Sequence, residues 1–141
     1  MRWLSLFVTP MCALMVGTAR ADPTPKQAAY CVAALKSRAE PLAERVRRGD
    51  NAAETQLFPI VTASFAFVGS AYKQGVRKPE ADTLVEQAQA AQAKLPRSEL
   101  GKVQDGCQAQ GTQIYANANF FEQQFVGHAA RNRIAKLRKT S

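Results

Sequence analysis

The stretch that decides the fold of this 141-residue chain is Leu57–Tyr72, LFPIVTASFAFVGSAY, a run of 16 residues without a charged side chain. Large apolar residues fall on all sides of this run when it is drawn as a helix. A helix that is apolar all round belongs at the centre of a domain. A membrane span would need about 20 predominantly apolar residues, and this run is shorter and includes a proline, a glycine and several hydroxyl groups. We therefore expect a buried central helix.

Turn-forming residues place one helix before this run. The first helix is expected over Pro25–Arg48, with Thr24 as its cap and proline in its first turn, where the missing N–H costs nothing. Pro41 interrupts the apolar spacing of that helix and predicts a kink or a break. After a glycine turn, Asn51 is a suitable cap for the central helix, which is expected over about Ala52–Gln74.

A third helix follows the central one. Gly75 is expected to end the central helix, and Pro79 to open the next, with two acidic residues in its first turn where negative charge suits the helix dipole. Its apolar residues recur at intervals of three and four as far as Leu95, which is typical of an amphipathic helix. Pro96 then stops it.

The last segment, about Glu99–Arg138, contains no proline and predicts a single long helix capped by Ser98. Three glycines in its first half each cost about 1 kcal/mol inside a helix, so its beginning is expected to be frayed or kinked. Its apolar stripe has a spacing close to a heptad and consists of Leu100, Val103, Cys107, Ile114, Ala118, Phe121, Phe125 and Ala129. Four such helices predict an irregular all-α four-helix bundle.

The beginning of the chain is typical of a cleavable export signal. A positively charged residue precedes the apolar stretch Leu4–Val16, and Ala19–Ala21 forms a small-x-small cleavage site. The apolar stretch is too short for a membrane anchor, and a lipoprotein signal would need a small residue directly before Cys12. We therefore expect a signal peptide over residues 1–21, a single helical domain over residues 22–141 and a periplasmic or secreted location.

Removal of the signal leaves Cys31 and Cys107, and an even pair of cysteines in an exported domain predicts one disulfide. The bond would close a loop of 76 residues, a constraint worth about 4 kcal/mol. Bridged α-carbons lie within about 7 Å, yet the two cysteines fall at opposite ends of an up-and-down bundle. Either Pro41 splits the first helix, or Pro59 splits the central helix, or the first and last helices cross steeply.

The sequence carries none of the usual catalytic signatures. It has one histidine, His128, at the border of the apolar stripe, and no hydrolase, metalloprotease, phosphate-loop or redox motif. After removal of the signal no methionine remains, so haem ligation by His and Met, or by two His, is excluded. We expect a protein that is not an enzyme, with no catalytic residue, no metal site and no cofactor.

Positive charge gathers at the end of the chain. Without the signal the chain has 17 basic and 11 acidic side chains, a net charge of +6. Such a surface attracts an acidic partner protein, or an anionic envelope polymer or lipid, with an affinity that depends on ionic strength. Nucleic acid is not favoured, because export argues against it and the basic tail lacks aromatic residues for stacking on bases.

Amide and aromatic side chains on the last helix form an adaptable contact surface beside these charges. The predicted partner-binding residues are Tyr115, Phe120, Gln124, His128, Arg131, Arg133, Lys136 and Arg138. We expect an exported binding protein that masks another exported protein, as an inhibitor or immunity-type protein does. The alternative is a periplasmic chaperone or envelope-stress protein, which would leave one side of the apolar central helix open.

The signal peptide and the disulfide can be tested by mass. The exported protein should have the intact mass of residues 22–141 less two hydrogen atoms, because cleavage follows Ala21 and one disulfide forms. Mass spectrometry before and after reduction measures both. A protein that retains Met1, or that reacts with a thiol reagent without prior reduction, would contradict this expectation.

Overall fold

A computed structural model describes residues 21–140, so the predicted signal peptide lies, except for its last residue, outside the described residues. The described chain is all-helical and contains the predicted disulfide. Its helices are α1 (Pro25–Arg47), α2 (Asn51–Lys73), α3 (Lys78–Gln92), α4 (Arg97–Asn117) and α5 (Phe120–Lys139). The all-α bundle is thus confirmed. It has five helices in the described residues and not four, because the predicted last helix is divided into α4 and α5.

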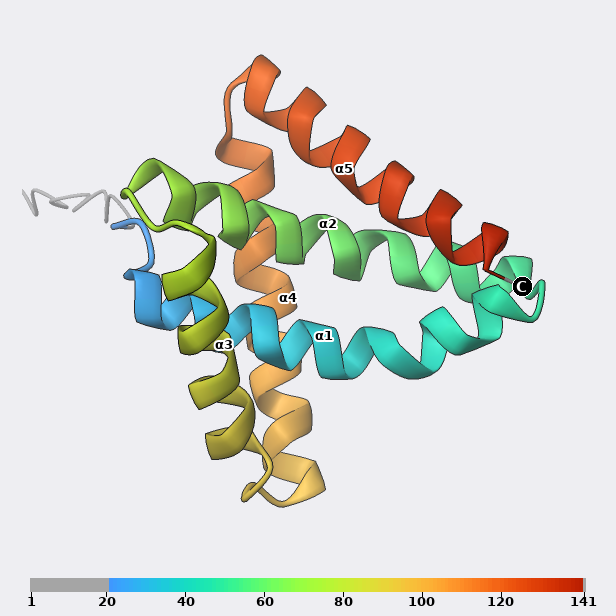
Figure 1. Cartoon of the computed structure of the whole chain (residues 1–141), viewed down its shortest axis with the longest axis horizontal. Helices are drawn as coiled ribbons and strands as arrows, with labels where there is room; N and C mark the ends of the chain where they lie inside the picture. The colour runs from blue at the N-terminus through green and yellow to red at the C-terminus, as the bar shows by residue number, and fades with distance from the viewer. Residues whose placement is uncertain (1–20, 141) are drawn as a thin grey trace, which may run out of the picture.

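Helix α2 lies at the centre of the arrangement. Figure 1 shows α1 and α2 side by side, α3 and α4 running across them, and α5 along the other side of α2. Helix α2 packs against α1, α4 and α5, which confirms a central place for the apolar run. The sequence left open whether the whole run is buried; one side of it is open, since Phe58, Val68 and Tyr72 are exposed.

Local sequence signals set most helix ends. Thr24 caps α1 in a capping box with Gln27. Gly49 and Gly75 follow α1 and α2 with positive φ angles of 86° and 92°, the left-handed conformation that glycine adopts without strain. The N-cap of α2 is Asp50 and not Asn51, because the Asp50 carboxylate accepts the N–H of Ala53.

The N-cap of α4 also differs from the predicted residue, Ser98. Its N-cap position is held by Pro96, without a side-chain hydrogen bond, and Ser98 lies inside the helix. Proline fits there because its fixed φ angle suits the entrance to a helix. It also has no backbone N–H, which at this position would have no partner within the helix.

The cysteines meet because α1 and α4 cross steeply (Figure 1). Neither Pro41 nor Pro59 ends its helix. The α-carbons of Cys31 and Cys107 are 5.2 Å apart, within the range that a disulfide spans. Beside the bond, the guanidinium of Arg38 on α1 pairs with the carboxylate of Asp105 on α4.

The core has two clusters, and both contain residues of α1 and α2. The first lies around the disulfide and joins α1, α2 and α4; its buried residues are Ala28, Cys31, Ala34, Leu35, Ile60, Ala63, Phe67 and Cys107. The second joins α1 and α2 to α5; its buried residues are Val46, Ala53, Leu57, Val61, Ala130, Ile134 and Leu137. The α1–α2 pair therefore links the two clusters.

The break between α4 and α5 contradicts the predicted single helix. The helix continues through its three glycines, so the expected frayed or kinked beginning is also wrong, and it ends instead at Asn117. Asn119 then caps α5: its side chain accepts the N–H of Glu122, whose carboxylate accepts the N–H of Asn119. This capping box restarts the helix in a different direction.

The break also changes which residues α5 buries. The predicted stripe included Phe121 and Phe125, which are 82% and 71% exposed. The residues that α5 buries are Val126, Gly127, Ala130, Ile134 and Leu137. The apolar spacing cannot run continuously through residues that leave the helix, so the stripe predicted from α4 does not extend into α5.

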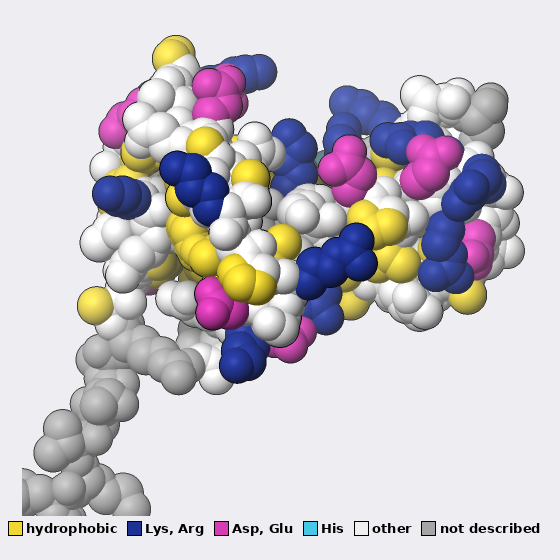
Figure 2. Space-filling view, turned by 90° about the horizontal axis from the view of Figure 1, so that it is seen from below, with side chains coloured by type: hydrophobic (Ala, Val, Ile, Leu, Met, Phe, Trp, Pro, Cys, Tyr) yellow, Lys and Arg dark blue, Asp and Glu magenta, His cyan; other side chains and the backbone are white. Residues whose placement is uncertain are grey.

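Charge is distributed unevenly over the surface. Figure 2 shows Lys and Arg side chains gathered at the end where α1 turns into α2 and α5 ends, with acidic side chains among them. No helix within residues 21–140 is long and apolar enough to cross a membrane. The disulfide is compatible with a periplasmic or extracellular protein.

The crossing of α4 over α2 predicts an unequal response of two glycines. A Cβ at Gly111 would lie 2.8 Å from both the Cβ and the carbonyl oxygen of Ala63, whereas one at Gly101 would meet open space. Gly111→Ala should lower the free energy of unfolding by about 1–3 kcal/mol. Gly101→Ala should raise it by about 0.5–1 kcal/mol, through helix propensity. Chemical denaturation measures both, and changes of the same sign would contradict the close crossing.

Candidate functional site

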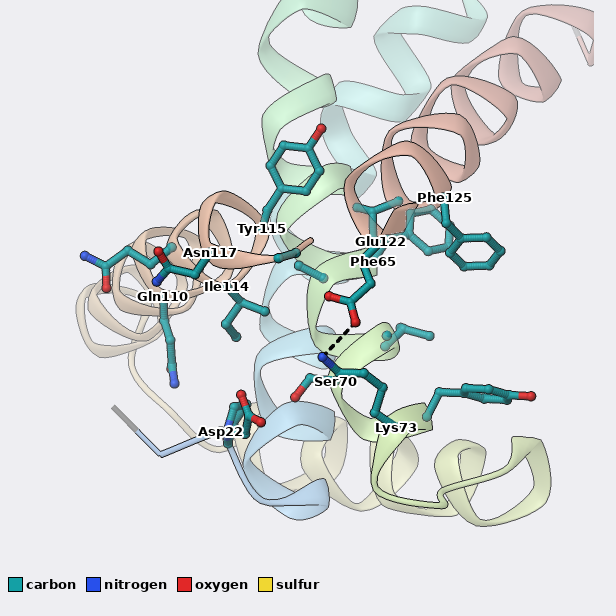
Figure 3. A pocket seen from close by; sticks show the side chains of 18 of the residues that line it. Asp22, Phe65, Ser70, Lys73, Gln110, Ile114, Tyr115, Asn117, Glu122 and Phe125 are labelled. Carbon is teal, nitrogen blue, oxygen red and sulfur yellow. Dashed lines mark hydrogen bonds and ion pairs between the residues drawn. The ribbon is translucent and has the colours of Figure 1, made fainter. Parts of the chain in front are cut away.

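A cleft of about 990 Å³ lies between α2, α4 and α5 and is the candidate functional site (Figure 3). Residues 21–23, just before α1, form one edge of it. Its apolar lining includes Phe65, Val68, Tyr72, Ile114, Phe121, Phe125 and Val126, and its polar lining includes Asp22, Ser70, Lys73, Gln110, Gln113, Asn117 and Glu122.

The cleft exists because α5 packs on α2 along only part of its length. The second half of α5 is held by Ile134 and Leu137 in the core, and by an ion pair between Arg138 and Glu54 of α2. Toward its beginning α5 diverges from α2, as Figure 1 shows, and the last turns of α4 lie beside the opening. The three helices therefore frame a wedge that is closed at one end.

Large apolar side chains, most of them aromatic, are exposed on two of the helices that frame this wedge. On α2, Tyr72 is 61% exposed and Val68 46% exposed. On α5, Phe121 and Phe125 are exposed to a greater extent, and the ring of Phe121 also meets that of Phe120 edge to face at 5.8 Å. An exposed group of large apolar side chains is typical of an interaction site.

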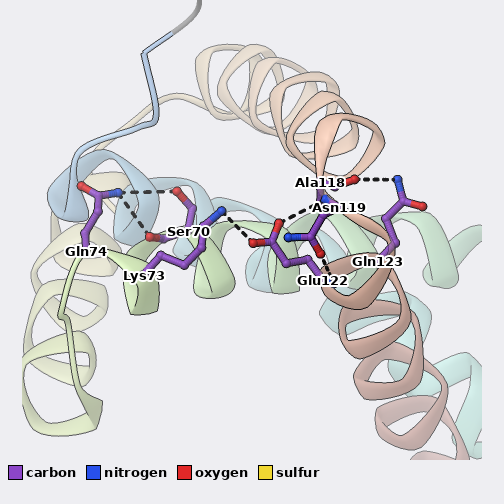
Figure 4. Close-up of polar contacts among 7 residues, drawn as sticks. All are labelled: Ser70, Lys73, Gln74, Ala118, Asn119, Glu122 and Gln123. Carbon is purple, nitrogen blue, oxygen red and sulfur yellow. Dashed lines mark hydrogen bonds and ion pairs between the residues drawn. The ribbon is translucent and has the colours of Figure 1, made fainter.

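An ion pair joins α2 to α5 across the cleft. The Lys73 ammonium donates a hydrogen bond of 3.0 Å to the Glu122 carboxylate, which also belongs to the capping box of α5 (Figure 4). The hydrogen bond from Lys73 is the main reason that the pKa of Glu122 is lowered. In Figure 3, Tyr115 and Phe125 are seen on opposite sides of Glu122.

Amide side chains fix the ends of the helices around the cleft. The Gln74 side chain donates to the carbonyl oxygens of Ser70 and Pro23, which ties the residues before α1 to the end of α2 (Figure 4). The Gln123 side chain donates to the carbonyl oxygen of Ala118 and to two others near the end of α4. The bonds from Gln123 serve carbonyl groups where α4 ends, at which a helix has no following turn to supply N–H donors.

Two further basic side chains lie near aromatic residues of the cleft. The Arg77 guanidinium lies 4.0 Å from the centre of the Tyr72 ring, a cation–π contact, and donates to the carbonyl oxygen of Tyr72. Arg131 and the Tyr115 hydroxyl flank Gly127, where an added Cβ would lie 3.4 Å and 3.5 Å from them.

The predicted partner-binding residues lie on α4 and α5, and the Tyr115 hydroxyl of α4 comes near Arg131 of α5 beside Gly127. Tyr115 lines the cleft. The others lie on the exposed surface of α5: Phe120, Gln124, His128, Arg131, Arg133, Lys136 and Arg138. The expected combination of amides and positive charge on one helix is divided, since most of the amides lie on α4 and the basic residues on α5.

The sequence prediction missed the exposed apolar residues of α2 and, on α5, Phe121 and Phe125. A signal for those of α2 is present: Phe58, Val61, Phe65, Val68 and Tyr72 alternate at intervals of three and four. This spacing is typical of a helix that packs against another helix. It was hidden because the other sides of the same helix are apolar too.

No group of three or more His, Cys, Asp or Glu side chains within residues 21–140 could hold a metal ion. The pKa of Asp50 is lowered, first by the N–H of Ala53 and then by Arg45, which its role as a helix cap explains. No known protein family, curated protein or solved structure is detectably similar to this chain.

The ion pair predicts a titration that depends on Lys73. Lys73→Met should raise the pKa of Glu122 toward that of an unpaired glutamate, because the Lys73 hydrogen bond is the main cause of its lowering. NMR titration of the Glu122 carboxyl carbon measures this pKa. The control is Lys94→Met, between α3 and α4 and outside the cleft lining. An unchanged pKa in Lys73→Met would contradict the assignment.

The same pair contributes to stability in a defined pH window. A lowered pKa in the folded state means that the unfolded chain binds more protons as the pH falls. The contribution is therefore present above the unfolded-state pKa of Glu122 and is lost as the pH falls through its folded-state pKa. Glu122→Gln should remove this part of the pH dependence.

Proposed function

We propose that this is an exported, non-enzymatic binding protein that holds an apolar segment of another molecule in the cleft between α2, α4 and α5. The observation that carries the proposal is the exposure of large apolar side chains on two walls, above all Phe121 at 82% and Phe125 at 71%. Covering one such side chain contributes about 1.5–3 kcal/mol. The two phenylalanines would therefore supply much of the binding energy.

The open side of α2 favours a chaperone-like role over specific masking by a polar surface. A buried apolar run would have left only polar surface for recognition, but Val68 and Tyr72 are accessible at the cleft. The α4 wall adds the amides of Gln110, Gln113 and Asn117. Amides can donate to and accept from the backbone of a bound chain, whatever its sequence.

A second candidate function rests on the basic end of α5. Arg131, Arg133 and Lys136 are exposed there, and such a surface suits an acidic exported protein, or an anionic envelope polymer or lipid. An inhibitor or immunity-type protein would bind through this end with strong dependence on ionic strength. Its binding would not depend on the aromatic residues of the cleft.

The proposed function can be tested with a dye that fluoresces on apolar protein surfaces. We expect the native protein to bind it at neutral pH, and Phe121→Gln with Phe125→Gln to lower the signal severalfold, because both rings line the cleft. Phe120→Gln is the matched control, since Phe120 is 68% exposed on the same helix but does not line the cleft.

Repeating the measurement at acid pH tests whether the surface is native. A signal at neutral pH comes from the folded cleft, whereas a signal confined to acid pH comes from loosened packing. Absence of dye binding by the folded protein at both pH values would refute the proposed function. An equal loss of signal in the Phe120 variant would show that the cleft is not the binding surface.

A further inference from the structure

The exposed side of α2 carries a seam for another helix. Phe58, Val61, Phe65, Val68 and Tyr72 follow the alternating three-and-four spacing of coiled-coil contact positions. Helix α5 covers this seam at Val61, which is buried in the second core cluster. Beyond that point α5 diverges, and the seam ends in side chains that are 46% and 61% exposed.

Helix α5 provides a second apolar row beside this seam. Phe121 and Phe125 are four residues apart and therefore lie one above the other on one face of α5. Both line the cleft that the seam borders, and the Lys73–Glu122 pair joins the two helices between the rows. Two apolar rows at helical spacing, on diverging helices, match the groove into which an amphipathic helix docks.

The dimensions favour a helix over a small ligand. A cleft of about 990 Å³ is at the upper end of the range for small-molecule sites, which bury most of the ligand within their walls. Here the outer walls remain 61–82% exposed at Tyr72, Phe121 and Phe125. A helix about 10–12 Å wide would cover both rows, and the open part of the seam, from Phe65 to Tyr72, has the length of about two helical turns.

The charge around the two rows is predominantly positive. Arg77 lies over Tyr72 at one end. At the other, Lys136 and Lys139 follow Phe121 by 15 and 18 residues, which places them on the same face of α5 about four and five turns later. Of the nearby acids, Glu54 and Glu122 are each held in an ion pair, and Asp22 lies at the edge of the cleft that residues 21–23 form. This arrangement complements a partner with acidic flanks.

We propose that the cleft docks an amphipathic α-helix of another protein, with apolar residues at alternating intervals of three and four and acidic residues on its flanks. The inference rests on the proposed function of the cleft as a binding site and specifies its occupant. The apolar stripe of the partner lies along the open part of the α2 seam and beneath Phe121 and Phe125. Its acidic flanks face Arg77 at one end and extend along α5 toward Lys136 and Lys139, which lie beyond the cleft lining.

A designed peptide tests this occupant directly. The probe is a fluorescent peptide of about 18 residues, with Leu at the contact positions and Glu and Ala elsewhere. One control has the same composition in scrambled order, and another has Lys in place of Glu. With the intact disulfide-bonded protein, we expect fluorescence anisotropy to give binding of the probe about tenfold tighter than of either control, a difference of about 1.4 kcal/mol.

Two protein variants locate the binding. Val68→Lys should lower the affinity for the probe about tenfold, because it places a charge on the exposed seam without disturbing the core. Thr83→Lys on α3 is the matched control, since Thr83 is equally a surface position but lies outside the cleft, and it should leave the affinity unchanged. Both variants should melt like the parent protein, as followed by circular dichroism.

The alternative outcomes separate this inference from the proposed function. Dye binding at the cleft together with equal binding of all three peptides would overturn the partner helix and leave the proposed function standing. Loss of dye binding and of preferential binding of the probe would overturn both the proposed function and the partner helix. Displacement of the dye by palmitate but not by the probe would assign the cleft to an acyl chain. A dimer that Val68→Lys dissociates would assign it to a second copy. Either of these last results would overturn the partner helix.

Discussion

The contact on which the rest of the structure depends is the close crossing of α4 over α1 and α2. It is possible because Gly111 has no side chain where α4 meets Ala63 and Phe67, and the disulfide between Cys31 and Cys107 holds the same face of α4 one turn earlier. Had these helices packed in the usual near-parallel way, α4 would have lain along α2 and covered it. The steep crossing leaves the last third of α2 beside a cleft.

The end of α4 determines the course of α5. The capping box of Asn119 and Glu122 starts a new helix, which returns along α2 and packs only in its second half. In that position Glu122 also reaches Lys73. One carboxylate thus caps the helix and fixes the distance between the two walls, so the width of the cleft is tied to the same local sequence that creates the break.

Much of the fold could be predicted from the sequence, because glycine, proline and capping residues act locally. The ends of α1 and α2 followed from such signals. The pairing of the two cysteines followed from their even number in a domain expected to be exported. The division of the last segment did not, although Asn119 and Glu122 have the spacing of a capping box; no proline or glycine marks the site. The cleft was missed for another reason. A run that is apolar all round predicts burial but does not indicate which of its sides will lack a neighbour, and that depends on the crossing at Gly111.

The exposure of Phe121 and Phe125 is a consequence of helix geometry and not of loose packing. Ala130 follows Phe121 by nine residues, and Ile134 follows Phe125 by nine. Nine residues make about two and a half turns, so the members of each pair lie on opposite faces of α5. Because Ala130 and Ile134 are buried against α2, a rotation of α5 that covered the phenylalanines on α2 would expose the second core cluster. The chain therefore cannot satisfy both faces of α5 from within, and the aromatic face is left for a partner.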